Sequence, residues 1–301
     1  MTTEADLLAK QVKGLSILAK ERVASFLTGN RRSLFRGQGT DFADLREYVI
    51  GDDSKYVDWR ATAKRNGNLI VKEYDVERNT NIILLLDVSA SMLIGKKRPR
   101  IMMAIEAVAS LAHATTQNKD FIGFGAFSDE VSIYIPPKGG VHHEFYIYRQ
   151  LLNIIPQGTT NIGEALKEVS TSLKQKSLIL VISDLHDNLE STLYGFKIAR
   201  AFKHEVQLLQ ISDYGEYVLP EKLGKIKFQG PETGKPQVID FTDTITKGLY
   251  SYELNKKLEE VNKFKRKLRG LKVRVIESRT EDLVDRVLNT YYSSKSRSYN
   301  I

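Results

Sequence analysis

Three short runs of nearly unbroken hydrophobic residues stand out along the chain, and they cover residues 82–86, 177–183 and 206–211. Runs of this length that are rich in Ile, Leu and Val predict strands buried on both faces, as in the centre of a parallel sheet. After the first run, apolar residues recur at helical spacing from Ile101 to Leu111, directly after Pro99. This alternation of buried strands with amphipathic helices predicts an α/β fold.

The same alternation continues through most of the second half of the chain. Further strands are expected at residues 121–127, 131–135 and 271–276, and further helices at 141–155, 161–173, 193–202, 254–268 and 283–291. Asn161 is expected to cap its helix, paired with Glu164 in a capping box. Pro and Gly interrupt the pattern at about 213–245, where the segments on either side of GPETGKP predict an inserted β-hairpin.

The N-terminal quarter has a different character, because charged and aromatic residues dominate it after a first helical segment at 7–27. Strands are expected at 45–50 and 69–74. We therefore predict three parts. Residues 1–79 form an N-terminal helix plus a small β-containing module that packs near the insertion. Residues 80–292 form the α/β domain with its insertion, and residues 293–301 form a C-terminal tail.

Trp59, the only tryptophan, lies between Asp58 and Arg60 in this N-terminal segment. It fits an aromatic anchor on a docking surface. The alternative, which we favour from the sequence, is a core tryptophan whose charged neighbours face water.

Composition narrows the compartment and the class of protein. The chain has no cysteine, which excludes disulfides and thiolate metal sites. No apolar run is long enough for a bilayer span, and the N-terminus lacks the apolar core of a signal peptide, so a cytoplasmic location is expected. The net charge is +8, but residues 256–274 hold nine basic and two acidic side chains, so the rest of the chain is close to neutral.

Oxygen-bearing side chains follow the predicted strands at the positions where ligands bind in α/β sheets. Asp87, Ser89 and Ser91 come after the first buried strand, Thr160 precedes a predicted helix, and Asp184 ends another buried strand. The carboxyl ends of parallel strands meet at one edge of a sheet, so these five should converge. Hydroxyl and carboxylate oxygens suit a hard divalent cation, above all Mg²⁺, with Mn²⁺ or Ca²⁺ as alternatives.

Such a donor set leaves the cation short of one strong ligand, which a carboxylate from another molecule would supply. The pattern therefore favours adhesion through a shared metal over chemistry on a small substrate. The alternative explanation is that these Ser and Asp residues only cap helices and turns.

Two groups of motifs resemble known families. The segments DVSAS, GTTNIGEAL and VISDL resemble the three pieces of the metal-ion-dependent adhesion site (MIDAS) of von Willebrand factor A-like domains. The upstream segment FADLREYVIGDDSKYVDWRATAKRNGNLIVKEYDVERN closely resembles the hallmark of the prokaryotic family called domain of unknown function fifty-eight. Together they imply a Rossmann-like von Willebrand factor A-like domain with a central six-stranded, mostly parallel sheet.

The resemblance also implies roles for the five residues and a partner. In von Willebrand factor A-like domains, the positions matching Ser89, Ser91 and Thr160 bind the metal through hydroxyls, and those matching Asp87 and Asp184 act largely through water. The family is associated with MoxR-type AAA+ ATPases. The expected function is a non-enzymatic, Mg²⁺-dependent adaptor that binds an acidic residue of a client in a chaperone-like or maturation task.

Two alternatives of other classes remain open at this stage. A haloacid-dehalogenase-like phosphohydrolase would use Asp87 as nucleophile, but that chemistry needs a second Asp where the chain has Ser89. Nucleic-acid binding would use the basic 256–274 stretch, although only Phe264 supplies an aromatic side chain there. The five histidines show no zinc-ligand spacing.

Overall fold

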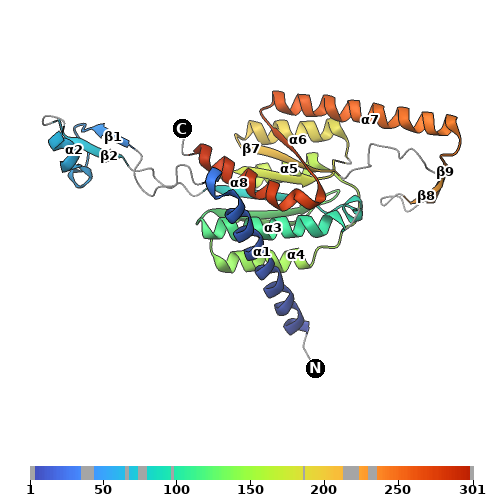
Figure 1. The fold of residues 1–301 in the computed structure, drawn as a ribbon, viewed down its shortest axis with the longest axis horizontal. Coiled ribbons are helices and arrows are strands. Elements are labelled where there is room, and N and C mark those ends of the chain that lie inside the picture. Colours follow the sequence, from blue (N-terminus) through green and yellow to red (C-terminus); the bar gives the residue numbers. More distant parts are fainter. Residues whose placement is uncertain are drawn as a thin grey trace.

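A six-stranded sheet forms the centre of the computed structural model, which describes residues 4–34, 44–64, 68–73, 80–95, 98–185, 187–212, 224–229 and 236–298. The strands lie in the order β10-β7-β6-β3-β4-β5 (Figure 1). Their bounds are β3 (Asn81–Asp87), β4 (Phe121–Phe127), β5 (Val131–Lys138), β6 (Leu178–Ser183), β7 (Glu205–Ile211) and β10 (Arg274–Ser278). Only the pairing of β4 with β5 is antiparallel, so the predicted fold class is confirmed.

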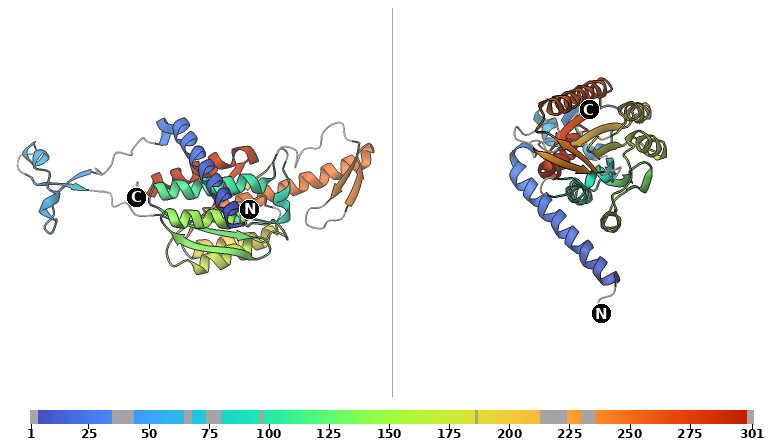
Figure 2. Two further views of the ribbon diagram at one scale, coloured as in Figure 1. Left: turned by 90° about the horizontal axis from the view of Figure 1, so that it is seen from below. Right: turned by 90° about the vertical axis from the view of Figure 1, so that its right-hand side faces the viewer.

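Helices cover both faces of this sheet (Figures 1 and 2). One layer contains α1 (Glu4–Leu34), α3 (Arg100–Gln117), α4 (Val141–Leu152) and α8 (Leu283–Ser298), and the other contains α5 (Ile162–Ser172), α6 (Leu189–Ala201) and α7 (Thr244–Gly270). Alternate residues of β3 enter the two cores, because Leu84 lies in the cluster under the first layer and Leu85 in the cluster under the second. This two-sided burial explains why the strand is hydrophobic without alternation.

Helix α1 belongs to the first of these layers. Its buried face, which includes Ala19, Val23 and Phe26, contacts α3, α4 and α8, and the ring of Phe26 stacks on that of Tyr292 at 5.9 Å between centroids. The sequence grouped this helix with the small module, whereas its apolar face completes the core of the sheet domain. The domain boundaries themselves stay a prediction.

The N-terminal module is a short hairpin whose connection contains two short helices. Strands β1 (Asp44–Glu47) and β2 (Ile70–Glu73) pair antiparallel, and η1 (Ser54–Tyr56) and α2 (Trp59–Lys64) lie between them. Both strands are shorter than expected. The expected packing of this module near the inserted hairpin is wrong, because the two lie at opposite ends of the molecule (Figures 1 and 2).

Trp59 is not a core residue, so the interpretation favoured from the sequence is wrong. It is 68% exposed at the start of α2, where the Asp58 carboxylate accepts hydrogen bonds from the backbone N–H groups of Arg60 and Ala61. The small interior is filled instead by the following residues: Val57, Thr62, Ile70 and Val71. The cap fixes the first turn of the helix at the surface and carries the indole outward.

The inserted hairpin is confirmed, with β8 (Lys225–Gln229) paired antiparallel to β9 (Pro236–Asp240). Helix α7 starts at Thr244, well before the expected residue 254, because Asp243 accepts hydrogen bonds from the backbone of Ile245 and Thr246. Helix α8 begins after η3 (Thr280–Asp282) and continues to Ser298, through positions that were expected to form a tail.

Candidate metal centre

The candidate site lies where β3 and β6 end side by side. These strands are parallel neighbours with Leu86 opposite Ile182, so Asp87 and Asp184 leave the sheet at the same edge. The chain continues from β3 to β4 on one side and from β6 to β7 on the other. This edge is therefore the topological switch point of the sheet, the place where open α/β sheets bind their ligands.

Three hydroxyl groups form a continuous row at this edge. The Ser89 and Ser91 hydroxyls are 2.9 Å apart, and the Thr160 hydroxyl donates to Ser89 Oγ at 2.9 Å. Ser91 belongs to the short helix η2 (Ala90–Leu93), whereas Thr160 comes from the loop before α5. All three side chains are buried. Residues 71 positions apart are thus brought into direct contact.

The backbone holds the two loops together beneath these hydroxyls. The Ala90 N–H donates to the Gly158 carbonyl at 3.1 Å, and the Gln157 N–H donates to the Val88 carbonyl at 2.9 Å. Gly158 has φ of 76°, a left-handed conformation that glycine adopts without steric cost. The GTTN segment can therefore turn sharply back toward β3 and place Thr160 over Ser89.

Asp87 is fully buried, and both of its carboxylate oxygens accept hydrogen bonds. Oδ1 accepts from the Ser89 backbone N–H at 2.9 Å, and Oδ2 accepts from the Ser183 hydroxyl at 2.6 Å. Burial raises the pKa of Asp87 to about 6, and the negative charge of Asp184 adds to the rise. Two carboxylates thus repel each other in a dry environment, and a cation between them would relieve this repulsion.

Asp184 is held from the other side by an arginine. Arg100, the first residue of α3, donates through an Nη atom to Asp184 Oδ2 at 2.9 Å, and both side chains are almost completely buried. Leu185 follows with φ of 63°, which costs a non-glycine residue about 1–2 kcal/mol. Its N–H donates to Ser183 Oγ at 3.0 Å, so the hydroxyl that orients Asp87 also fixes this turn.

The spacing of the hydroxyls fits a small octahedral ion. Adjacent ligands of Mg²⁺, each bound at about 2.0–2.1 Å, lie about 2.9 Å apart in an octahedron. The two hydroxyl separations, each of which is also a hydrogen bond, have that length in the structure. The described parts of the chain hold no group of three or more His, Cys, Asp or Glu side chains suited to a metal. A cation here would thus depend on hydroxyl donors together with the two carboxylates.

The structure therefore brings all five predicted residues to one edge, and it adds two that sequence reasoning missed. Ser183 orients Asp87, and Arg100 holds Asp184. Ser183 could have been found as the last polar residue of a buried strand. Arg100 gave no such signal, because an arginine at a helix start usually faces water.

At Asn161 the expected helix cap is confirmed, because its side chain accepts a hydrogen bond from the Glu164 N–H. The Glu164 side chain pairs with Lys167 and closes no capping box.

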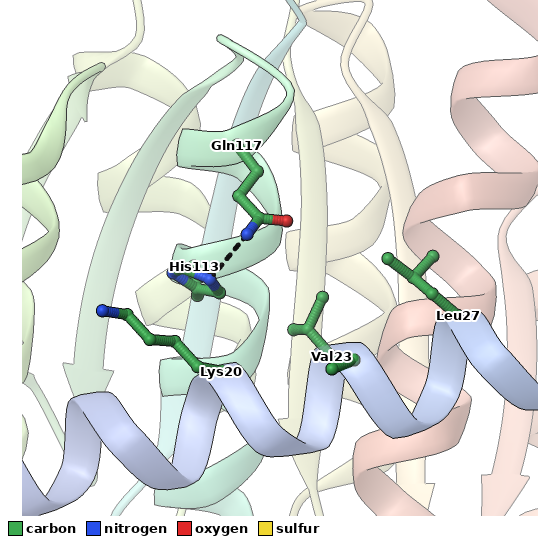
Figure 3. A pocket seen from close by; sticks show the side chains of 6 residues that line it. Lys20, Val23, Leu27, His113 and Gln117 are labelled. Atoms are coloured by element: carbon green, nitrogen blue, oxygen red, sulfur yellow. Dashed lines mark hydrogen bonds between the residues drawn. The ribbon is translucent and has the colours of Figure 1, made fainter.

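A hollow lies between α1 and α3, and none of the five candidate residues lines it (Figure 3). Its volume is about 500 Å³, and its lining residues are Lys20, Val23, Ala24, Leu27, His113 and Gln117. His113 Nδ1 lies 3.0 Å from the Glu144 carboxylate and Nε2 lies 2.9 Å from the Gln117 amide. The Nδ1 contact joins α3 to α4 and the Nε2 contact stays within α3, so both ring nitrogens have partners and this histidine has a structural role.

The comparison with protein families identifies the chain. The family model described as "Protein of unknown function DUF58" matches residues 44–260. The chain belongs to this family. A curated relative is an uncharacterized protein of Mycobacterium tuberculosis, 24% identical over 234 residues that cover 75% of this chain and 72% of the relative. The region that the DUF58 family model matches contains both the N-terminal module and the five residues at the sheet edge.

Solved structures share the fold of the sheet domain. The pilus adhesin SpaC from Lactobacillus rhamnosus GG superposes with a TM-score of 0.50 at 15% identity, covering 75% of this chain and 32% of SpaC. The SpRpn10 VWA domain gives a TM-score of 0.45 at 10% identity, covering 71% and 95% of the two chains. The sheet domain has a von Willebrand factor A-like fold. Among the helices of the described residues, none combines the length and apolar content needed to cross a membrane.

Proposed function

We propose that this DUF58 chain is a non-enzymatic interaction protein that binds an acidic residue of a partner through a divalent cation. The observation that carries the proposal is the contact of three hydroxyls from two distant loops beside two buried carboxylates at the switch point. Three hydroxyls in contact supply neutral oxygen donors of the kind that a hard divalent cation binds, whereas an ordinary helix cap needs only one of them.

Each residue has a distinct role in this proposal. Ser89, Ser91 and Thr160 would supply neutral oxygen ligands, and Asp87 and Asp184 would balance the charge, in direct contact or through water. Mg²⁺ suits this small set of oxygen donors better than Ca²⁺, which takes about six to eight oxygens at about 2.3–2.6 Å. When bound, the cation would supply an electrophilic position for a carboxylate, because its hydroxyl ligands are neutral and leave it short of one strong ligand.

The partner side of the proposal rests on the family resemblance. We propose that the chain acts as an adaptor of a MoxR-type AAA+ ATPase in the maturation of a protein client, and that one acidic side chain of the partner completes the metal shell. A location in the cytoplasm belongs to the same proposal. The exposed Trp59 of the N-terminal module offers a further contact surface for such an assembly.

The geometry disfavours the phosphohydrolase alternative. A nucleophilic Asp must present an oxygen to the substrate, but Asp87 has no exposed surface and both oxygens already accept hydrogen bonds. The residue two positions on, where that chemistry needs a general acid, is Ser89. The Asp87 carboxylate is therefore held in place as a buried group beside the hydroxyls.

Capture of the ATPase tests the proposal. The full chain is immobilised and exposed to the purified MoxR-type ATPase of the source organism, in Mg²⁺ and in excess EDTA. We expect retention in Mg²⁺, loss in EDTA and recovery when Mg²⁺ is restored. Ser89→Ala should abolish retention. Ser110→Ala is the matched control, because Ser110 is equally buried but donates to the Glu106 carbonyl inside α3.

Retention that persists in EDTA would refute metal-dependent binding, and retention by Ser89→Ala would refute the assigned site. Failure of the ATPase to bind in any condition would refute the adaptor role alone, since the metal site can be measured without a partner.

A further inference from the structure

Helix α7 is anchored to the sheet domain by only half of its length. Its C-terminal half contacts α6 and β10 through three buried residues, Val261, Phe264 and Leu268. Between Thr244 and Leu258 no side chain is buried. Figures 1 and 2 show this N-terminal half extending from the body of the molecule toward the β8–β9 hairpin.

An apolar stripe lies along the outer face of this half. Ile245, Leu249 and Tyr252 are 72%, 64% and 69% exposed. Their spacing of four and three residues places them on one side of the helix, and at 100° per residue that side points away from the buried face. Local packing does not explain them, because the nearby Tyr250 is the residue that packs edge-on against Phe241 at 5.2 Å.

The stripe continues as positive charge toward the C-terminal half. Lys256 and Lys263, both exposed, lie four and eleven residues after Tyr252 and so on the same side of the helix, with Glu259 between them. The whole helix holds eight basic and three acidic residues. One face of α7 is therefore apolar over its first two turns and has a net positive charge beyond them, from Lys256, Glu259 and Lys263.

We propose that this face of α7 binds an amphipathic helix of a partner protein, with apolar residues opposite Ile245, Leu249 and Tyr252 and acidic residues opposite Lys256 and Lys263. The alternation of three and four residues is the ridge pattern that two packed helices share. The acidic half follows from charge complementarity, which sets partner choice and register in such pairs.

Other occupants fit this face less well. A second copy would bring its own α7, in which eight basic residues outnumber three acidic ones, so like charges would prevail between the two helices. A nucleic acid would match the lysines but would leave three large apolar side chains exposed, since phosphate contacts require no apolar stripe. The binding face contains none of the five residues of the metal site, so the contacts of this interaction do not require the cation.

Binding of two synthetic peptides to the full chain tests the inference. The acidic peptide is a helix of roughly three heptads with Leu at the core positions of its first half and Glu at those of its second half; the basic peptide has Lys in place of Glu. Fluorescence anisotropy should show the acidic peptide binding at least roughly tenfold more tightly, a difference of about 1.4 kcal/mol. The double variant Lys256→Glu, Lys263→Glu should reverse the preference.

Two single variants locate the contact. Leu249→Asp should abolish binding, whereas Tyr194→Asp should not, because Tyr194 is equally exposed, at 64%, but lies on α6. Binding of the acidic peptide should be the same in Mg²⁺ and in EDTA, so the outcome does not depend on the proposed metal site.

Four results would overturn the inference. These are equal affinity for the two peptides, binding to neither, displacement of the acidic peptide by duplex DNA, and a chain dimer in sedimentation that Leu249→Asp dissociates. The third would assign the face to nucleic acid, and the fourth to a second copy of the chain.

Discussion

The sheet domain and the N-terminal module use polar residues in opposite ways. At the sheet edge, Asp87, Asp184 and Arg100 are buried, and each depends on partners far away in sequence. In the module, Arg46 binds the Asp52 carboxylate with two hydrogen bonds of 2.7 Å, and the two residues are six positions apart. One region buries charge inside a large apolar core, and the other shapes a loop with charges near its surface.

This difference has an energetic consequence. Removing one partner of a buried pair leaves a charge that neither water nor protein solvates, which strongly destabilises the fold. Removing one partner of an exposed pair returns the other to water at little cost. We therefore expect substitutions in the sheet domain to act globally and those in the module to act locally.

The largest effect is expected from Leu85→Ala in the centre of β3. Leu85 is completely buried between β4 and β6, so its truncation leaves a cavity and should lower the free energy of unfolding by about 3–5 kcal/mol. Val49→Ala, at a position that is largely exposed in the module, is the control and should change it by less than about 0.5 kcal/mol. Urea denaturation measures both, and similar values for the two would contradict the comparison.

Arg100→Met should lower the free energy of unfolding by about 3 kcal/mol, because it removes the guanidinium group that pairs with the buried carboxylate of Asp184. The double variant Arg100→Met, Asp184→Leu should recover most of this loss, since both buried charges are then absent. Thermal and urea denaturation of the two variants supply the test. If the double variant were less stable than Arg100→Met, loss of the buried ion pair would not be the cause of the destabilisation.

A smaller effect is expected where α5 and α6 cross. A Cβ atom added at Gly195 would lie 2.5 Å from the Gly163 carbonyl oxygen, so Gly195→Ala should cost about 1–3 kcal/mol of unfolding free energy. Gly14→Ala in α1, where nothing lies within 4 Å, should instead stabilise by about 0.4–1 kcal/mol. Opposite signs in calorimetric unfolding are the predicted result, and a stabilising Gly195→Ala would show that the helices can separate.

The smallest effect is confined to the module and depends on pH. The hydrogen bonds from the Arg46 side chain, and then from the Val49 N–H, lower the pKa of Asp52 from 3.8 to about 2. Because the folded pKa is the lower one, this contribution to stability is complete above pH 3.8 and is lost as the pH falls toward 2. In the unsubstituted chain, NMR should show the amide of Val49 losing protection over that pH range. In Arg46→Ala, the same amide should already lack protection at neutral pH.

Protection of sheet-domain amides, such as those of β3, should not change with Arg46→Ala. A loss there at the same pH would show that the module and the sheet domain unfold as one unit.

The same comparison explains which features sequence analysis could predict. The run from Ile82 to Leu86 predicted β3 because a strand buried on both faces leaves a continuous apolar signature. The convergence of Asp87 with Thr160 could be predicted because strand ends meet at one edge. The buried partner Arg100 could not, since no local pattern distinguishes a charged residue that turns inward.

Prediction from the sequence failed for other reasons at Trp59 of the N-terminal module and at the start of α7. Trp59 was expected in the core because tryptophan is usually well buried, yet an interior of a few small side chains has no room for an indole. The start of α7 before residue 254 could not be predicted, because its apolar residues there face outward, whereas an amphipathic helix is recognised by an apolar face directed at the core.

Titration of the purified full chain with Mg²⁺, followed by calorimetry, tests the central claim most directly. We compare Asp87→Asn with Asp120→Asn, because both carboxylates are buried and hydrogen-bonded but Asp120 lies before β4 at the opposite edge of the sheet. We predict saturable binding with one ion per chain, unchanged in Asp120→Asn and weakened at least roughly tenfold in Asp87→Asn. No saturable binding, or equal affinity in the two folded variants, would contradict a cation site at the end of β3.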